Sequence, residues 1–199
     1  MPFPDEIAPV VLVQRSESWS TEYVALSRML QQLDLSPSGA IDHIGSTSVP
    51  GLVAKDVIDV QIRVLDIESE KTINAFAAIG FRHRPEDWNN VEITRNGPEV
   101  KLVFAPRIGA RRSNIHFRAD GSTGSRDSLL FRDYLRTNEE ARNGWGEFKM
   151  SIVRNVNDID LATYGQIKQP RWHKLMEEAD TWAAREGWSA ESLVPWSRL

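Results

Sequence analysis

Two short polar segments contain residue types that could carry out chemistry on a phosphate. In the first, Gly45-Ser46-Thr47-Ser48, a glycine lets the backbone approach a ligand closely, and hydroxyl and N–H groups suit a phosphate oxygen. The second is Asp59-Val60-Gln61, where Asp59 and Gln61 share one side of a strand. Alone, the first segment is also typical of a plain capped turn. The combination of this segment with Asp59, which could act as a base or as a ligand for Mg²⁺, predicts a phosphate site.

The elements before and after the first segment follow from periodicity and turn residues. Apolar residues at helical spacing predict a helix near 19–34, and 36–39 has the composition of a turn. The short apolar run 40–44 predicts a strand that leads directly into Gly45. We expect Pro50 to begin a short helix behind the turn.

The clearest strand pattern lies at 57–64. One face carries apolar residues: Ile58, Val60, Ile62 and Val64. Asp59, Gln61 and Arg63 lie on the other face with Val57, so one face is expected to join the core and the other to line a site. A helix follows near 69–79 and ends at Gly80.

The rest of the chain predicts hairpins and then helices. Three strand-like runs, at 91–95, 100–105 and 114–118, are separated by turn residues, which indicates antiparallel hairpins in a mixed sheet. The last third has helical periodicity, and Pro170 is expected to start or kink the final helix, which ends near Gly187. The fold class is therefore α/β (α+β), with flanking helices and a helical C-terminal third.

Composition limits the class of protein. The 199 residues include 41% hydrophobic residues and no repeat or linker, which favours one domain over 1–199 with a core at about 10–180. The absence of cysteine excludes disulfides, thiolate nucleophiles and iron-sulfur clusters, and leaves no zinc constellation. The tail 188–199 either packs on the body or meets a partner, and a homodimer through the tryptophan-rich C-terminal helix stays open.

Charge and hydropathy address location and partners. A net charge of −4 argues against broad binding of nucleic acid, which normally needs a basic surface. The first residues form no signal peptide, and no stretch reaches the roughly 20 apolar residues of a membrane span. We therefore expect a cytoplasmic location and no membrane partner.

A long motif resembles the GrpB family. The matching residues are His43-Ile44-Gly45-Ser46-Thr47-Ser48-Val49-Pro50-Gly51-Leu52, Ala54-Lys55, Ile58-Asp59, Asn114-Ile115-His116-Phe117, Gly121-Ser122, Leu130-Phe131-Arg132-Asp133-Tyr134-Leu135-Arg136, Lys149, Tyr164 and Lys168. The resemblance covers roughly residues 10–180. It implies a nucleotidyltransferase-like fold, and a similar domain is fused to dephospho-CoA kinase in some bacteria.

The resemblance also implies what the site residues do. In that superfamily three carboxylates hold Mg²⁺ ions that bridge the triphosphate. Here only Asp59 matches a carboxylate, while Gln61 and His116 stand where the other two would be. An amide and an imidazole are poorer ligands for Mg²⁺. Either one metal is held with help from the substrate, with Asp59 as its ligand, or none is used.

Further residues are expected to bind phosphate or substrate. They are His43, Gly45, Ser46, Thr47, Lys55, Arg132, Arg136, Lys149 and Lys168. The spacing of Arg132 and Arg136 also fits a surface salt-bridge ladder, so the resemblance decides in favour of the site. The histidines His43 and His116 fit a structural role equally well.

Other charged residues are weaker candidates. Asp56 is expected to project away from Asp59 unless a bulge intervenes, and Glu92 joins Asp59 only if the sheet brings the two together. Arg107, Arg111 and Arg112 favour a solvated loop over a basic flap above the substrate.

Three functions are consistent with these residues. The first is a nucleotidyl- or phosphoryl-transferase acting on a phosphate-bearing substrate, such as a nucleotide, in which Asp59, Gln61 and His116 are catalytic. The second is a module that binds a nucleotide or a ligand like coenzyme A without catalysis. The third is a metal-free transferase or ligase in which Asp59 and His116 perform acid–base chemistry.

Overall fold

The computed structural model describes residues 8–33, 35–36 and 38–196, so Pro37 of the predicted turn, the first residues and the end of the tail lie outside it. The helical elements are α1 (Ser18–Leu30), the 3₁₀ turn η1 (Ser46–Ser48), α2 (Ser69–Ala78), α3 (Asp87–Asn90), α4 (Thr123–Thr137), α5 (Glu139–Asn155) and α6 (Leu161–Glu186). The strands are β1 (Ser38–Ile44), β2 (Ile58–Val64), β3 (Phe81–His83), β4 (Val91–Thr94), β5 (Gly97–Pro106), β6 (Ser113–Ala119) and β7 (Val194–Pro195).

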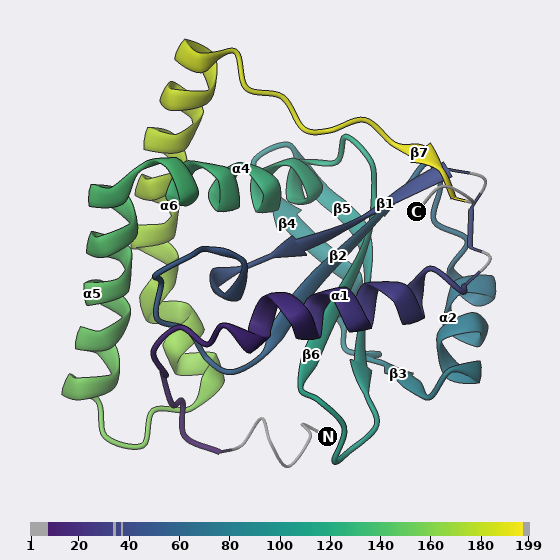
Figure 1. Ribbon diagram of the computed structural model, residues 1–199, viewed down its shortest axis with the longest axis horizontal. Helices are drawn as coiled ribbons and strands as arrows, with labels where there is room; N and C mark the ends of the chain where they lie inside the picture. Colours follow the sequence, from purple (N-terminus) through teal and green to yellow (C-terminus); the bar gives the residue numbers. More distant parts are fainter. Residues whose placement is uncertain (1–7, 34, 37, 197–199) are drawn as a thin grey trace.

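The strands form one mixed sheet. Its order is β3-β5-β6-β2-β1-β7, and β4 pairs with β5 at the side (Figure 1). Strands β2 and β6 run parallel, whereas the other pairs are antiparallel. The register places Asp59 beside Asn114 and Gln61 beside His116. The predicted hairpins and mixed sheet are therefore confirmed.

The two faces of β2 differ in chemistry, as its alternating sequence predicts. Ile58, Val60, Ile62 and Val64 are buried in a core with side chains of α1 and α2. These two helices lie on this side of the sheet, with α1 crossing in front of the strands in Figure 1. Burial of apolar side chains on this face stabilises the sheet. The polar residues of β2 project from the other face, on which the site lies.

The C-terminal third forms a helical layer beside the sheet, at the left of Figure 1. Helix α4 begins where Ser122 accepts a hydrogen bond from the Ser125 N–H. Helix α6 begins earlier than its apolar pattern indicates, with Asp160 as its cap, and ends at left-handed Gly187. Pro170 lies inside α6, so it does not start the final helix, and the alternative that it kinks the helix stays a prediction.

A second correction concerns the segment behind the glycine turn. The short helix η1 spans Ser46–Ser48 and precedes Pro50, which lies in the following turn. Hydrogen bonding within the turn explains this, because Ser48 donates its hydroxyl to the Gly45 carbonyl at 2.6 Å.

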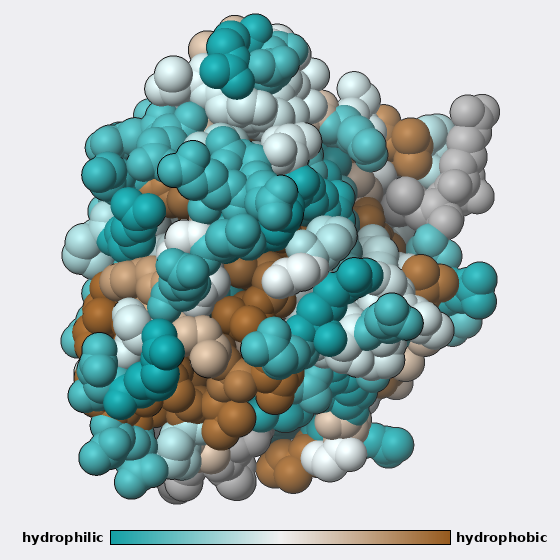
Figure 2. Space-filling view, turned by 60° about the vertical axis from the view of Figure 1, so that its left-hand side comes forward, coloured by the Kyte–Doolittle hydropathy of each residue, from teal (hydrophilic) through white to brown (hydrophobic). Residues whose placement is uncertain are grey.

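The surface of the helical side is uneven in hydropathy. Figure 2 shows hydrophobic residues gathered in the lower half of this face and hydrophilic residues in its upper half. None of the described helices combines the length and the apolar character needed to cross a membrane.

Candidate active site

A cavity of about 490 Å³ lies between the polar face of the sheet and helices α4, α5 and α6. We call it the Asp59 pocket. It brings together eight of the residues predicted from the sequence: Gly45, Ser46, Thr47, Lys55, Asp59, His116, Lys149 and Lys168. The parallel pairing of β2 with β6 and the turn after β1 supply one wall, and the helices supply the lysines of the opposite wall.

Asp59 is the central carboxylate of the pocket. Its Oδ1 accepts a hydrogen bond of 3.0 Å from Asn114 Nδ2, and His116 Nε2 lies 3.9 Å from the same oxygen. The second distance is too long for a hydrogen bond but allows an electrostatic interaction between the imidazole and the carboxylate. Burial alone would raise the pKa of Asp59, yet its contacts with His116 and Asn114 outweigh burial and lower that pKa. Asp59 is therefore ionised at neutral pH.

The pKa of His116 is lowered as well, but the main cause is burial. Burial lowers its pKa, and the charge of Asp59 only partly opposes this effect. His116 is therefore neutral at pH 7. A proton on Nε2 is the favoured tautomer, because that nitrogen faces the carboxylate of Asp59.

Gly45 lets the turn after β1 pass close to Asp59. Its φ is +67°, a conformation that side chains rarely adopt, and a Cβ there would lie 2.6 Å from Asp59 Oδ2. The glycine of the predicted phosphate turn is therefore required by both backbone conformation and contact with the carboxylate.

Substituting Gly45→Ala is expected to destabilise the protein by about 2 kcal/mol or more, because strain adds to a clash with Asp59. Urea unfolding measures this change. Gly165→Ala is the matched control, since its added Cβ meets no atom within 4 Å and α6 favours alanine. Equal stability of the two variants would contradict the assigned role of Gly45.

Three lysines face Asp59 from different elements. Lys149 is 2% exposed and donates hydrogen bonds to Ser46 Oγ at 2.9 Å and to the Val53 carbonyl. Burial lowers its pKa to about 7, and the positive charges of Lys168 and Lys55 contribute. Within the described residues, neither Lys149 nor Lys168 forms an ion pair with a carboxylate.

Lys168, on α6, contributes a further positive charge to the lining of the pocket. Its Nζ lies 4.9 Å from the ring centre of Tyr164, a cation–π contact. Burial and the charge of Lys55 lower its pKa to about 8. Both lysines therefore gain from a negatively charged ligand, which would restore the charge that burial disfavours.

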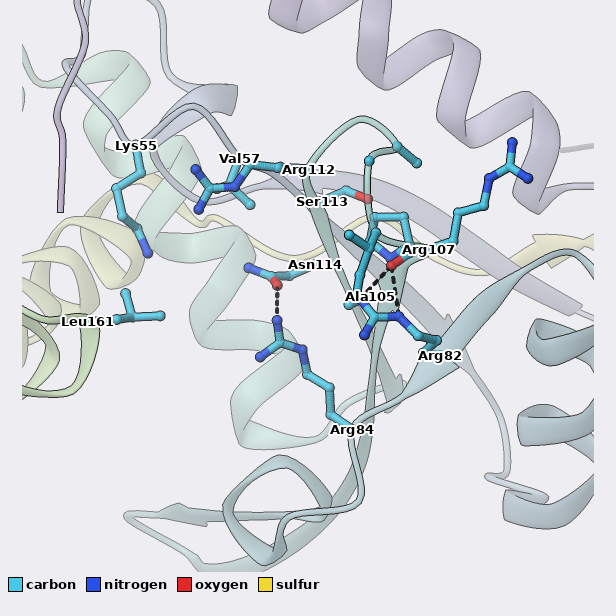
Figure 3. Close-up of a pocket in the computed structure, with 14 residues that line it drawn as sticks. Lys55, Val57, Arg82, Arg84, Ala105, Arg107, Arg112, Ser113, Asn114 and Leu161 are labelled. Carbon is cyan, nitrogen blue, oxygen red and sulfur yellow. Dashed lines mark hydrogen bonds between the residues drawn. The ribbon is translucent and has the colours of Figure 1, made fainter. Parts of the chain in front are cut away.

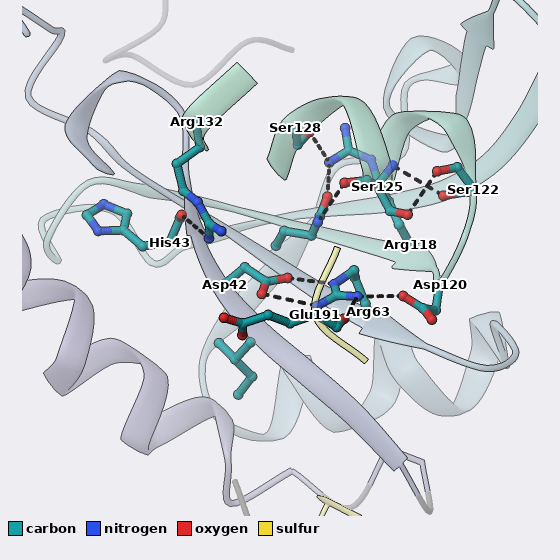
Figure 4. Close-up of polar contacts among 12 residues, drawn as sticks. Asp42, His43, Arg63, Arg118, Asp120, Ser122, Ser125, Ser128, Arg132 and Glu191 are labelled. Atoms are coloured by element: carbon teal, nitrogen blue, oxygen red, sulfur yellow. Dashed lines mark hydrogen bonds and ion pairs between the residues drawn. The ribbon is translucent and has the colours of Figure 1, made fainter. Parts of the chain in front are cut away.

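Gln61 lies beneath the pocket rather than in its wall. It is fully buried, donates to the Ser125 carbonyl at 3.1 Å and accepts from Arg118 Nη1 at 2.9 Å. Arg118 also contacts Ser128 Oγ at 3.3 Å (Figure 4). This network joins β2 and β6 to α4, so Gln61 fixes the helix against the sheet.

His43, Arg132 and Arg136 likewise lie outside the lining of the pocket. His43 stacks on the Tyr23 ring and contacts Thr47 Oγ1 at 3.0 Å, and burial lowers its pKa to about 4. Arg132 donates to the His43 carbonyl at 3.4 Å, as Figure 4 shows, and Arg136 donates twice to the Ser48 carbonyl. These residues hold the turn from behind.

Several pocket residues were missed or left open by the sequence. Glu92 does lie in the pocket, where Arg118 binds it through two hydrogen bonds of 3.0 Å. Arg118 and Asp127 were not singled out, although Arg118 sits at the end of a predicted strand. Burial raises the pKa of Asp127, which is bound by Arg95 at 3.1 Å. Glu92, Arg118 and Asp127 come from β4, β6 and α4, and no spacing in the sequence predicts that these elements meet.

The residues present do not fit a two-metal site. Among the described residues, no group of three or more His, Asp or Glu side chains could hold a metal ion. Glu92, the acid that β4 contributes to the pocket, is bound by Arg118. Three lysines line the same pocket as Asp59. Asp56 is also unsuitable, because Trp19 and Arg111 bind it outside the pocket. Asp127 is paired with Arg95 and Arg126, so among the described acids of the pocket Asp59 stays as the candidate ligand for Mg²⁺.

Comparison with known proteins places the chain in a family. The profile of the GrpB protein family matches residues 9–178. A dephospho-CoA kinase of Mycolicibacterium paratuberculosis is 29% identical over 91% of the chain and 48% of its own length. UPF0157 protein SCO7215 of Streptomyces coelicolor is 33% identical over 71% of the chain and 70% of its own length. The chain spans about half the length of the kinases that it matches.

A solved structure supports the same conclusion. The conserved protein GrpB from Enterococcus faecalis matches 85% of this chain and 96% of its own, with a TM-score of 0.69 and 25% identity. The overall fold therefore agrees with the family match. The chain belongs to the GrpB family.

Proposed function

We propose that the Asp59 pocket binds the phosphates of a nucleotide and that the protein transfers a nucleotidyl or phosphoryl group from it. The observation that carries the proposal is the convergence of Lys55, Lys149 and Lys168 around one carboxylate, beside the Gly45-Ser46 turn. Within the described residues Lys149 and Lys168 form no ion pair with a carboxylate, and burial disfavours their charge, so both attract an anion strongly. One phosphate could interact with both ammonium groups.

The remaining walls suit the rest of a nucleotide. Phe131, Trp145, Tyr164 and Trp172 line the same cavity, and aromatic rings can stack on a base. The volume of about 490 Å³ lies within the usual range for small ligands. The likeness to proteins named dephospho-CoA kinase also supports a nucleotide-related ligand.

The proposed transfer uses the charges that the pocket provides. An acceptor oxygen attacks the phosphorus atom and its bond to phosphorus forms, while the bond from phosphorus to the leaving group breaks. The leaving group is pyrophosphate in nucleotidyl transfer and the nucleoside diphosphate in phosphoryl transfer. Asp59 accepts the proton of the acceptor, while Lys149 and Lys168 neutralise the charge on phosphate oxygens. The lysines thus take over much of the charge neutralisation that metal ions perform in two-metal enzymes.

Nucleotide affinity is expected to weaken as pH rises above 7. Below the pKa of about 7, Lys149 carries its charge in the free protein, and above it the anion must bind together with a proton. Lys168 adds a second such dependence above about 8. The dissociation constant should therefore rise by roughly tenfold or more between pH 7 and 9, measured by calorimetry at constant ionic strength. A constant affinity would contradict this role.

Calorimetric titration with the four ribonucleoside triphosphates and coenzyme A, each with and without Mg²⁺, tests the proposed function. Binding should weaken when Lys149 is replaced, and turnover of the bound nucleotide should depend on Asp59. A non-catalytic binding module is the second candidate, favoured by the lack of a cluster of metal ligands among the described residues and by the buried position of Gln61. Tight binding without any turnover would select it, and no binding by any nucleotide would refute both.

A further inference from the structure

A second cavity, of about 490 Å³, lies on the side of the sheet that α1 covers. Its walls come from α1, from the end of α2 with the start of β3, and from the loop between β5 and β6. Most of its lining is apolar and includes Leu26, Met29, Ile79 and Phe81. We call it the α1 cavity. Its size and its mainly apolar walls are typical of a site for a small molecule.

The α1 cavity and the Asp59 pocket lie on opposite faces of the sheet. Ile58 and Ser113 pair with each other across β2 and β6 and line the α1 cavity. The next pair, Asp59 and Asn114, lines the Asp59 pocket, because side chains alternate along a strand. None of the described residues lines both cavities. A ligand in the α1 cavity would therefore bind separately from the nucleotide proposed above.

Ser113 brings an unused hydroxyl group to the α1 cavity. Its side chain is buried, and Oγ has no hydrogen-bond partner among the described residues. Figure 3 shows a neighbouring cavity, which shares Ser113 and Arg107 with this one. There the Ser113 side chain points away from Asn114, toward the segment that carries Arg107. Burial of an unpaired hydroxyl is unfavourable, so a polar group of a ligand would be stabilised beside it.

The charged residues of the α1 cavity leave one positive charge for a ligand. They are Glu22, Arg107 and Arg111. Arg111 Nη2 lies 2.7 Å from Glu22 and 2.6 Å from Asp56, so the charges of these three residues largely offset one another. Arg107 is exposed, and it forms no ion pair within the part of the chain that the structure describes. An anionic group at this end of the cavity would complement Arg107.

We propose that the α1 cavity binds a small molecule with an apolar body and one carboxylate group. The body would lie against Leu26, Met29 and Phe81, and burial of its surface would supply most of the affinity. The carboxylate would lie at the loop between β5 and β6, where it could accept hydrogen bonds from Ser113 and Arg107. This site does not depend on the proposed function of the Asp59 pocket.

Calorimetric titration with octanoate, and with uncharged octanol for comparison, tests this site. Ala25→Trp should block the cavity, because Ala25 lines it from an exposed position on α1 that tolerates a larger side chain. Val24→Trp is the matched control, since Val24 is exposed on the same helix but does not line the cavity. Arg107→Gln and Ser113→Ala remove the two polar contacts.

Circular dichroism and thermal unfolding verify that each variant is folded. Ser113→Ala should unfold at the temperature of the wild type or above it, because its hydroxyl has no partner to lose among the described residues. Any loss of affinity in this variant would then reflect a contact with the ligand and not a damaged fold.

Octanoate is expected to bind the wild type, and Ala25→Trp should weaken its binding more than about tenfold, against less than about twofold for Val24→Trp. Arg107→Gln and Ser113→Ala should each weaken octanoate binding by roughly two- to fivefold, and Arg107→Gln should leave octanol binding unchanged. Lys149→Met, which impairs the Asp59 pocket, should bind octanoate like the wild type.

No binding of octanoate, equal binding by the Ala25 and Val24 variants, or unchanged octanoate binding by Arg107→Gln would overturn the proposal. Light scattering on the same samples covers a different occupant. Self-association that Ala25→Trp abolishes would assign the cavity to a second copy of the chain and would also overturn the proposal. Failure of nucleotide binding, with octanoate binding retained, would refute only the proposed function.

Discussion

The Asp59→Asn variant is expected to fold normally and to lose turnover of the bound nucleotide by a factor of about 10²–10⁴. Asparagine has nearly the same volume and can still accept the hydrogen bond from Asn114, so the sheet should keep its structure. It cannot accept the proton of an acceptor. Rate measurements on purified protein, together with thermal unfolding, separate loss of chemistry from loss of fold.

Asp56→Asn is the matched control for this experiment. Asp56 lies three residues earlier in the chain, but it contacts Trp19 and Arg111 outside the pocket. Its substitution should leave turnover unchanged and lower stability by at most about 1 kcal/mol, because asparagine still accepts the hydrogen bonds from Trp19 and Arg111 but loses the negative charge that pairs with Arg111. Equal turnover of Asp59→Asn and the wild type would exclude Asp59 as the base.

Lys149→Met should weaken nucleotide binding by roughly 10- to 100-fold, because a hydrogen bond to a charged group contributes about 1.5–3 kcal/mol. The variant should also lose the pH dependence that begins near 7, while the one near 8 due to Lys168 persists. Calorimetric titrations at pH 7, 8 and 9 measure both effects.

Lys174→Met controls for a general loss of positive charge. Lys174 is exposed on α6, the helix that carries Lys168, and does not line the Asp59 pocket. Its affinity and pH dependence should match the wild type. If both lysine variants behave alike, Lys149 does not contact the phosphates.

Much of the fold followed from local patterns. Alternation at 57–64 assigned the faces of β2, because a strand's side chains alternate regardless of its partners. Turn residues assigned the hairpins of β4, β5 and β6. The start of α6 was missed because Gly165 and Pro170 disfavour a helix in its first turns, although Leu161 and Tyr164 pack in a core cluster there.

The site was predicted less completely, because contacts between elements decide it. His43 pairs with Val60 in the sheet, so its side chain points to the apolar face and stacks on Tyr23 of α1. Arg132 and Arg136 reach backbone carbonyls behind the turn. The family motif included these residues although they support the turn instead of lining the pocket.

The roles of Arg118 and Glu92 show a second limit. The two form a close ion pair across β6 and β4, strands that are not neighbours in the sheet. No spacing in the sequence indicates that pair. Their contact removes Glu92 from the acids available to a metal, and Asp59 is left with the lysines.

A crystal structure of the protein with the nucleotide that binds most tightly tests the central claim most directly. The account predicts phosphate oxygens within hydrogen-bonding distance of Lys149 Nζ, beside the Gly45-Ser46 turn, with the base among the aromatic residues of the Asp59 pocket. A nucleotide bound elsewhere, with Lys149 still joined only to Ser46 and Val53, would contradict it.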